Sequence, residues 1–231
     1  MRAVLLLLLS SAAVADYTES RQLSEDTAGA SVIEIDAGAG ALTVTGSSTV
    51  SDIVVEARIV LEGMSDKKAS DFIASKIRLE LKRVGDTVRL VSDIGDRGWS
   101  WGSQAYIDLD VQVPDSIDLV IDDSSGSLRV QDVLSHVAID DSSGSVDVIN
   151  VGSLYIDDGS GGVDVIGVAG DVEIDDGSGS LDIANVGGSV TIDDGSGSIT
   201  VRSVAVDLMV VNDGSGGVDY SDIGGTVYID D

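Results

Sequence analysis

The phrase Ile156-Asp157-Asp158-Gly159-Ser160-Gly161-Gly162-Val163-Asp164-Val165 sets the architecture of this chain, because it returns many times along it. Its first residue falls at positions 121, 139, 156, 174, 192, 211 and 229, so successive copies lie 18, 17, 18, 18, 19 and 18 residues apart. A fixed period of this length indicates stacked coils of chain, none of which buries its apolar face alone.

Apolar residues recur at five positions of each coil. In the coil that follows Ile156 they are Val163, Val165, Val168, Val172 and Ile174. Val163 and Val165 lie two residues apart, so their side chains point to the same side of a strand. The three-residue step from Val165 to Val168 indicates a corner instead of a continued strand. We therefore predict an all-β fold, a β-solenoid with coils of about 18 residues and an aliphatic interior.

Residues 1–15 have the pattern of a signal peptide. Arg2 supplies a positive start, an apolar run follows from Val4 to Leu9, and Ala13-Val14-Ala15 forms a small-residue cleavage site. This run is too short for a membrane anchor, and no later stretch is long and apolar enough to span a membrane. The chain has no cysteine for lipid attachment or disulfides. We expect export, to the periplasm or to the cell exterior.

The repeat begins early, is interrupted, and then resumes. Residues 16–30 are polar and irregular, and we expect a flexible N-terminus there. A single solenoid domain is predicted over 31–231. Within it, residues 31–46 match the repeat as an early coil, residues 47–116 form an insertion, and residues 117–231 contain the regular coils.

The insertion is predicted to contain longer strands and one short helix. Alternating apolar residues over 52–61 predict a strand with one buried face. Ser65-Asp66 precedes a segment typical of an N-capped helix of two or three turns. A hairpin is predicted to turn at Gly85-Asp86, and a further half-buried strand is predicted to end at Pro114.

Three of these features together resemble a family of bacterial exported proteins known as putative adhesins, a domain of unknown function. They are the early coil Ile35-Asp36-Ala37-Gly38-Ala39-Gly40, the strand Leu109-Asp110-Val111-Gln112-Val113-Pro114, and the Ser-Gly coils from Ser125-Gly126 onward. The resemblance covers Val32 to Asp231. It implies a β-solenoid in or outside the bacterial envelope, and it brings no catalytic residues with it.

The charge balance restricts the partners. The chain has 41 acidic and 13 basic side chains, and its net charge is −28. Nucleic-acid binding needs clustered Lys and Arg, and docking on anionic lipid needs the same, so the sequence argues against both. Strong acidity favours cations, basic partners or plain solubility. An unknown protein or a glycan is the expected partner.

Stacking turns the repeated Asp-Asp doublet into two columns of carboxylates. One interpretation is calcium bound between coils, because hard cations prefer several carboxylate and carbonyl oxygens. Its candidate ligands are Asp140, Asp141, Asp157, Asp158, Asp175, Asp176, Asp193 and Asp194. The other interpretation is that each Asp accepts N–H groups of the following Gly-Ser-Gly turn. For the second Asp of each doublet we favour the turn, which is its immediate neighbour. No other cofactor is indicated.

Two further features are candidates for a structural or a binding role. Trp99 and Trp101 lie between glycines, where they suit contact with a sugar or a protein partner, or cover an open end of the solenoid. The glycines that recur once per coil are predicted to make corners with positive φ. They are Gly126, Gly144, Gly161, Gly179, Gly197 and Gly216.

Three functional hypotheses follow, in order of preference. The first is an exported, non-enzymatic solenoid that serves as an adhesin-like protein or an envelope scaffold. The second is a calcium-binding module. The third is a carbohydrate-active enzyme, which is disfavoured because the regular coils offer only Arg129, Arg202 and His136 as basic groups, too scattered for a site. The sequence stops within a coil at Ile229-Asp230-Asp231, where an uncovered coil invites self-association while its acids oppose it.

Overall fold

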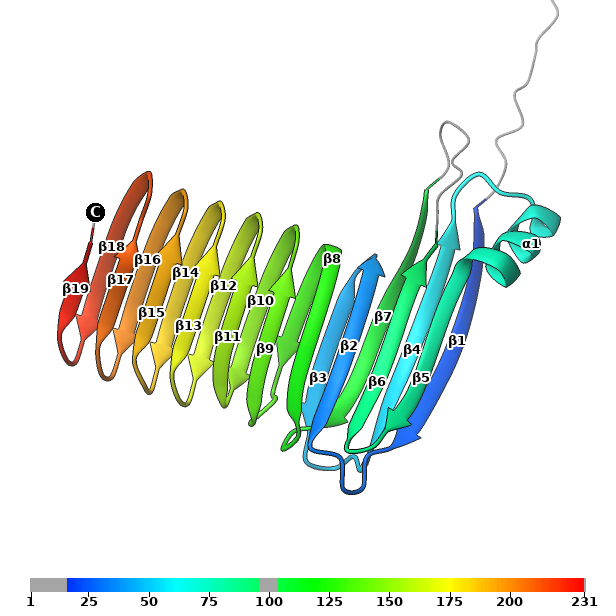
Figure 1. The fold of residues 1–231 in the computed structure, drawn as a ribbon, viewed down its shortest axis with the longest axis horizontal. Coiled ribbons are helices and arrows are strands. Elements are labelled where there is room, and N and C mark those ends of the chain that lie inside the picture. Colours follow the sequence, from blue (N-terminus) through cyan, green and yellow to red (C-terminus); the bar gives the residue numbers. More distant parts are fainter. Residues whose placement is uncertain (1–15, 96–103, 231) are drawn as a thin grey trace, which may run out of the picture.

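The computed structural model describes residues 16–95 and 104–230, and over these residues the chain forms a β-solenoid with one short helix (Figure 1). Its strands belong to two facing sheets, sheet A and sheet B, with the apolar side chains between them. The predicted fold class is therefore confirmed.

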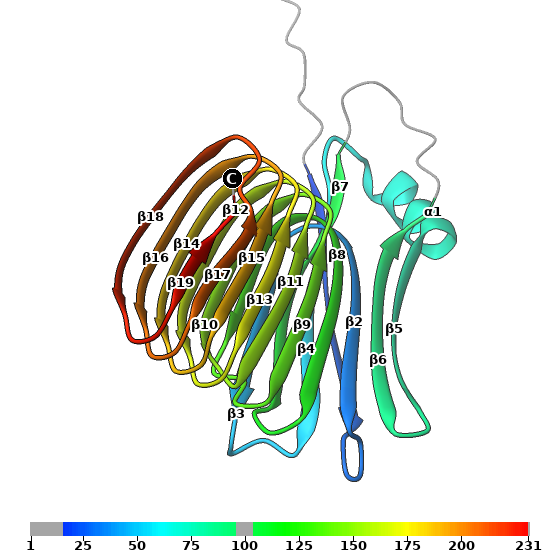
Figure 2. The ribbon, with the colours of Figure 1, turned by 60° about the vertical axis from the view of Figure 1, so that its left-hand side comes forward.

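Each regular coil contributes one strand to each sheet (Figure 2). In sheet B these are β9 (His136–Asp141), β11 (Ser153–Asp158), β13 (Val172–Asp176), β15 (Val190–Asp194), β17 (Leu208–Asn212) and β19 (Val227–Ile229). In sheet A they are β10 (Gly144–Val151), β12 (Gly161–Val168), β14 (Gly179–Val186), β16 (Gly197–Val204) and β18 (Gly216–Ile223). Successive strands pair in parallel, so each residue stacks on its equivalent one coil earlier.

The long strand β8 (Asp118–Gln131) joins the regular coils to the N-terminal part. Its first half pairs with β2 (Val32–Ala39) and β9 in sheet B. Its second half pairs with β3 (Leu42–Ser47) and β10 in sheet A. The predicted early coil, which contains β2 and β3, therefore stacks directly on the first regular coil. In sequence the two are separated by the insertion, which is about seventy residues long.

The insertion continues both sheets beyond the early coil. In sheet A, β7 (Ala105–Pro114) pairs with β3 and with β4 (Asp52–Leu61). In sheet B, β6 (Thr87–Ile94) pairs with β2 and with β5 (Ile77–Val84), which confirms the predicted hairpin. Helix α1 (Asp66–Lys76) follows Ser65 as predicted and buries Ala69 and Ile73, but the Ser65 side chain makes no capping hydrogen bond. No helix within the described ranges is long and apolar enough to cross a membrane.

The expectation of a flexible segment over 16–30 is wrong for most of its length. Strand β1 (Tyr17–Asp26) pairs antiparallel with β4, from Tyr17 opposite Leu61 to Asp26 opposite Asp52. The positions of β1 opposite buried residues of β4 include Glu19, Arg21 and Glu25. Because β1 is an edge strand, backbone pairing holds it without the apolar alternation by which a strand is recognised in sequence.

The predicted inward positions are confirmed. Val163, Val165, Val168, Val172 and Ile174 are all buried, and so are their equivalents in the neighbouring coils. The predicted register is wrong by one residue at the 19-residue step. There the ladder shifts after Ile192, which pairs with buried Val210, while Asp193 pairs with Asn212. Val211 is the extra, exposed residue of a β-bulge.

Two separate structural requirements explain why glycine recurs at one position of each coil. Gly126, Gly144 and Gly161 have φ of +139°, +155° and +152°, as predicted for corners that only glycine adopts readily. Gly179, Gly197 and Gly216 do not have a φ in the positive region that favours glycine, so for these three the prediction is wrong. What they share with the first three is close stacking. A Cβ added to Gly179 would lie 1.7 Å from the carbonyl oxygen of Gly161 in the preceding coil, which leaves no room for a side chain.

Candidate functional site

The two aspartates of each doublet face opposite sides of their strand. In β11, Asp157 is exposed and Asp158 is 1% exposed, as strand alternation requires for consecutive residues. Parallel pairing repeats this split in the five coils from β8 to β15. We call the exposed set the outer column. It contains Asp122, Asp140, Asp157, Asp175 and Asp193. The buried set is the inner column. It contains Asp123, Asp141, Asp158, Asp176 and Asp194.

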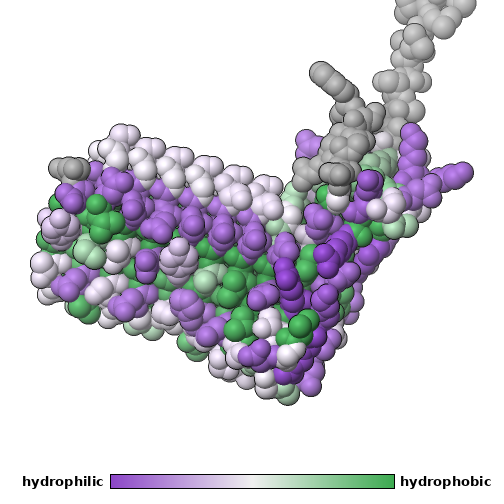
Figure 3. All heavy atoms as spheres, viewed as in Figure 1, coloured by the Kyte–Doolittle hydropathy of each residue, from purple (hydrophilic) through white to green (hydrophobic). Residues whose placement is uncertain are grey.

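The outer column lies on the outward face of sheet B, and a hydrophilic stripe runs along the coils in the space-filling view (Figure 3). Neighbouring carboxylates are one strand spacing apart, about 4.8 Å. At that distance two charges repel by only about 1 kcal/mol in water, a cost that an exposed column sustains. The pKa of Asp122 is raised, first by partial burial and then by the nearby charges of Asp140 and Asp36.

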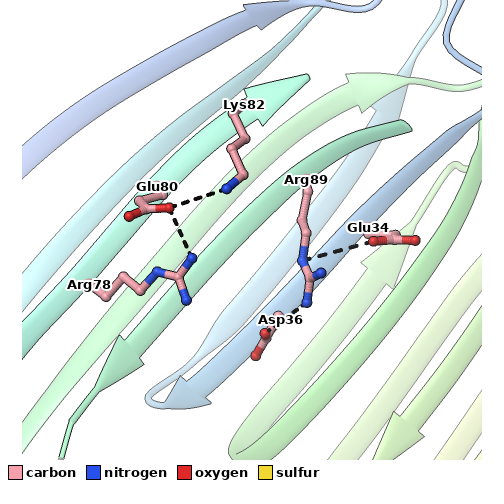
Figure 4. Close-up of polar contacts among 6 residues, drawn as sticks. All are labelled: Glu34, Asp36, Arg78, Glu80, Lys82 and Arg89. Carbon is pink, nitrogen blue, oxygen red and sulfur yellow. Dashed lines mark hydrogen bonds and ion pairs between the residues drawn. The ribbon is translucent and has the colours of Figure 1, made fainter. Parts of the chain in front are cut away.

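Basic side chains gather on the same sheet where the outer column begins (Figure 4). Asp36 on β2 lies opposite Asp122, which extends the column by one carboxylate. The guanidinium of Arg89 on β6 donates to Asp36 at 3.3 Å and lies 3.9 Å from Glu34. On β5, Arg78 and Lys82 contact Glu80 at 3.0 and 3.6 Å. Sequence reasoning missed this cluster, although the alternation of Arg78, Glu80 and Lys82 indicated one exposed face.

The inner column is held by the turn that follows it. One carboxylate oxygen of each of four aspartates accepts the backbone N–H of the serine two residues later, at distances between 2.9 and 3.3 Å. These serines are Ser143, Ser160, Ser178 and Ser196. The turn interpretation of the second Asp is therefore confirmed for these coils. It explains why a carboxylate is followed by Gly-Ser-Gly or Ser-Ser-Gly in each repeat.

The same carboxyl groups are only half satisfied. The Oδ2 atoms of Asp141, Asp158, Asp176 and Asp194 are buried and have no hydrogen-bond partner among the described residues, and neither oxygen of Asp123 has one. Burial raises the pKa of Asp123 to about 7 and those of Asp158 and Asp176 to about 6, and a stacked carboxylate adds to each shift. Burial also raises the pKa of Asp141 and of Asp194, and a serine N–H opposes both shifts.

The predicted calcium ligands are thus divided between two environments. Asp140, Asp157, Asp175 and Asp193 face solvent, whereas Asp141, Asp158, Asp176 and Asp194 face the interior. Because the members of a doublet point away from each other, they cannot chelate one ion together. Within residues 16–95 and 104–230, no three acidic or histidine side chains are grouped to hold a metal ion. The structure brings these eight residues together as two columns of like groups, one exposed and one buried.

The outward face of sheet A carries a further row of acids, which we call the third column and which other residue types interrupt. Asp147, Asp164 and Asp182 stack in register, with Arg129 before them and Thr200 after them. The scattered basic groups pair with this column, since Arg129 contacts Asp147 at 3.2 Å and Arg202 contacts Asp182 at 3.7 Å. His136 is exposed. Trp99 and Trp101, the predicted partner contacts, lie outside the described residues.

An open polar cavity of about 610 Å³ lies over β1, β3, β4 and β7. In it, Arg58 is paired with Asp108, which also accepts the backbone N–H of Ala41 at 3.0 Å. Glu56 and Asp110 lie directly opposite each other on adjacent strands. Sequence reasoning did not find this cavity, because β1 and β3 are distant from β7 in sequence and only the sheet order brings them together.

Solved structures similar to this chain include several adhesin-named proteins. A putative cell adhesion protein from Clostridium sporogenes has a TM-score of 0.35 and 13% identity, over 92% of this chain and 99% of that chain. A putative adhesin from Bacteroides fragilis has a TM-score of 0.45 and 12% identity, over 92% and 97%. A putative lipid binding protein from Parabacteroides distasonis has a TM-score of 0.34 and 11% identity, over 93% and 97%. No family model matches the chain, and neither does any curated protein.

Proposed function

We propose that this chain is an exported, non-enzymatic scaffold of the adhesin type, which binds a partner along the outward faces of its solenoid. One observation carries the proposal. The coils stack in parallel register, with a single bulge among the regular coils, so each outward position becomes a straight column of side chains. A surface of this kind offers many weak, equally spaced contacts, which suits binding to an extended or repetitive partner.

The placement of the perturbed acids disfavours catalysis. An enzyme site holds titratable groups with shifted pKa values in a cleft that substrate reaches. Here the acids with the large pKa shifts are Asp123, Asp158 and Asp176, whose unpartnered oxygens have almost no accessible surface. They cannot touch a substrate while the coil is folded. The exposed acids instead form open columns.

The partner is expected to be a basic protein surface or a glycan. The outer column and the third column give both faces of the solenoid an acidic character, and the net charge of the chain is −28. Carboxylates bind Lys and Arg through charge-assisted hydrogen bonds, and they accept hydrogen bonds from sugar hydroxyl groups. Export rests on the signal-peptide pattern of residues 1–15.

The test is a binding assay with the chain lacking residues 1–15. Beads coated with it are exposed to envelope extracts, whole cells and a panel of glycans, and retention is compared with that of a variant carrying Asp140→Asn, Asp157→Asn and Asp175→Asn. A matched variant carries Asp147→Asn, Asp164→Asn and Asp182→Asn on the opposite sheet. We expect one variant to lose retention, with faster dissociation and weaker salt dependence, and the other to keep it.

Two results would contradict the proposal. One is equal retention of all partners by wild type and both variants, since the outward columns would then contribute nothing. The other is release of new reducing ends from a glycan by the folded chain, which would favour the carbohydrate-active alternative.

A further inference from the structure

The inner column is a continuous internal row of acids. Asp123 lies opposite Asp141, which lies opposite Asp158, and the parallel register continues through Asp176 to Asp194. All five are at most 5% exposed. Successive carboxyl groups are therefore separated by one strand spacing, about 4.8 Å, inside the fold. A charge on every one of them would be sustained only in the presence of a counterion or a large number of donors.

Among the described residues, neither a counterion nor a large number of donors surrounds the column. The charged groups close to it are all carboxylates, and they act from the same strands or from the next coil. They are Asp122, Asp140, Asp157, Asp193 and Asp213. Toward the N-terminus the column continues as Ala37 on β2 and then as Ser92 on β6, both neutral. The turn serines donate one N–H to four of the acids, which leaves each Oδ2 without a donor.

The missing partner must be small, because these Oδ2 atoms have almost no accessible surface. A proton fits that space, and it removes the negative charge whose burial is unfavourable. We propose that the acids of the inner column bind protons in the folded chain, and that uptake and loss of these protons control how tightly the coils of the solenoid are held together.

The direction of the pH effect follows from the raised pKa values. An acid whose pKa is higher in the folded chain holds its proton more tightly there, so unfolding releases protons. The stability that the bound protons give to the folded chain is complete below the pKa of an unfolded aspartate, near 4. It is lost as the pH rises through the pKa values in the folded chain, about 6 for Asp158 and Asp176 and about 7 for Asp123. The solenoid should therefore be most stable in mild acid and weaken toward slightly alkaline pH.

The experiment compares wild type with an inner variant carrying Asp158→Asn and Asp176→Asn. The outer variant, carrying Asp157→Asn and Asp175→Asn on the same strands, is the matched control with the same type and number of substitutions. For wild type we expect the thermal midpoint to fall by roughly 10 °C between about pH 5 and about pH 8, with the infrared band of protonated carboxyl groups disappearing over that range. The inner variant should lose about half of both changes, because Asp123, Asp141 and Asp194 remain in it, and the outer variant should retain them in full.

Four results would contradict the proposal. The first is a wild-type midpoint that is constant or rises over this range. The second is an equal pH response of the inner and outer variants, which would assign the effect to overall charge. The third is the absence of the protonated-carboxyl band in wild type at mildly acidic pH, a measurement that holds even if the inner variant does not fold. The fourth is stabilisation at about pH 8 by a metal cation but not by tetramethylammonium at equal ionic strength, which would assign the column to cations.

Discussion

An alanine at Gly161 tests the close stacking of the coils. Gly161 begins β12 with φ of +152°, a conformation that side chains strongly disfavour. A Cβ there would lie 1.6 Å from the carbonyl oxygen of Gly144 in the preceding coil, whereas ordinary contact begins at 3.4 Å. The methyl group therefore needs roughly 2 Å of additional space, and only separation of the two coils at this corner can provide it.

The magnitude follows from what that separation breaks. The N–H of Gly144 donates to the carbonyl oxygen of Ser160, in the coil of Gly161, at 3.0 Å. Loss of that hydrogen bond costs about 1 kcal/mol, and the unfavourable φ costs about 1–3 kcal/mol more. We expect Gly161→Ala to reduce the free energy of unfolding by about 3 kcal/mol. In a chain of this length that reduction lowers the thermal midpoint by roughly 10 °C.

The next residue provides the control. A Cβ on Gly162 meets only the hydroxyl oxygen of Ser180, at an ordinary 3.5 Å, so Gly162→Ala should change the midpoint little or raise it slightly. Thermal melts followed by circular dichroism measure both variants. Equal midpoints for Gly161→Ala and Gly162→Ala would refute the argument, because only Gly161 combines the unfavourable φ with a methyl group directed at the preceding coil.

Three other changes test separate parts of the structure. Val165→Asp puts a carboxylate into the aliphatic interior and should cost more than about 4 kcal/mol, whereas Ile166→Asp, at a half-exposed neighbour, should cost little; urea denaturation distinguishes them, and similar midpoints would mean that the inward assignment is wrong. Arg89→Ala removes an exposed pair with Asp36 and should lower stability by less than about 1 kcal/mol, with the difference vanishing in high salt. The thermal midpoint should be the same in millimolar calcium as in a chelator, because each doublet is split across its strand; a midpoint that rises with calcium would support calcium binding instead.

Periodicity made the solenoid predictable. Residues such as Val163 and Val165 recur in every coil, and a residue that stacks on its own equivalent has an environment fixed by the period. The insertion was predictable only element by element. Its strands were recognised from alternation, but the sequence carries no local sign that β6 and β7 would pair with the early coil. Strand β1 was missed because its inward positions are largely polar, and the bulge at Val211 because a neighbouring Val210 offered the same apolar side chain.

The aspartate doublet shows that residue type alone does not define a role, because the side of the strand on which a residue lies also matters. Asp157 and Asp158 are the same residue type, adjacent, and repeated together, which favoured one shared role such as ion binding. Successive residues of a strand face opposite sides, so the two aspartates have opposite environments. Because Ile156 faces inward, Asp158, two residues later, faces inward as well. The burial of Asp158 was therefore derivable. Its unpartnered Oδ2 was not, because that depends on how tightly the turn closes over it.

Turn chemistry and burial make conflicting demands on the inner column. The turn needs an acceptor two residues before its serine, and asparagine would supply one without a charge. Asn212, which stands in register with the outer column, makes a bond of this kind when it accepts the N–H of Gly214 at 3.1 Å. Aspartate is nevertheless present at all five buried positions, where its charge is disfavoured. A neutral acid resolves the conflict, since it keeps an acceptor for the turn and carries no charge. The difference between Asp and Asn at this position is therefore the capacity to release a proton, and the pH response of the solenoid measures that capacity.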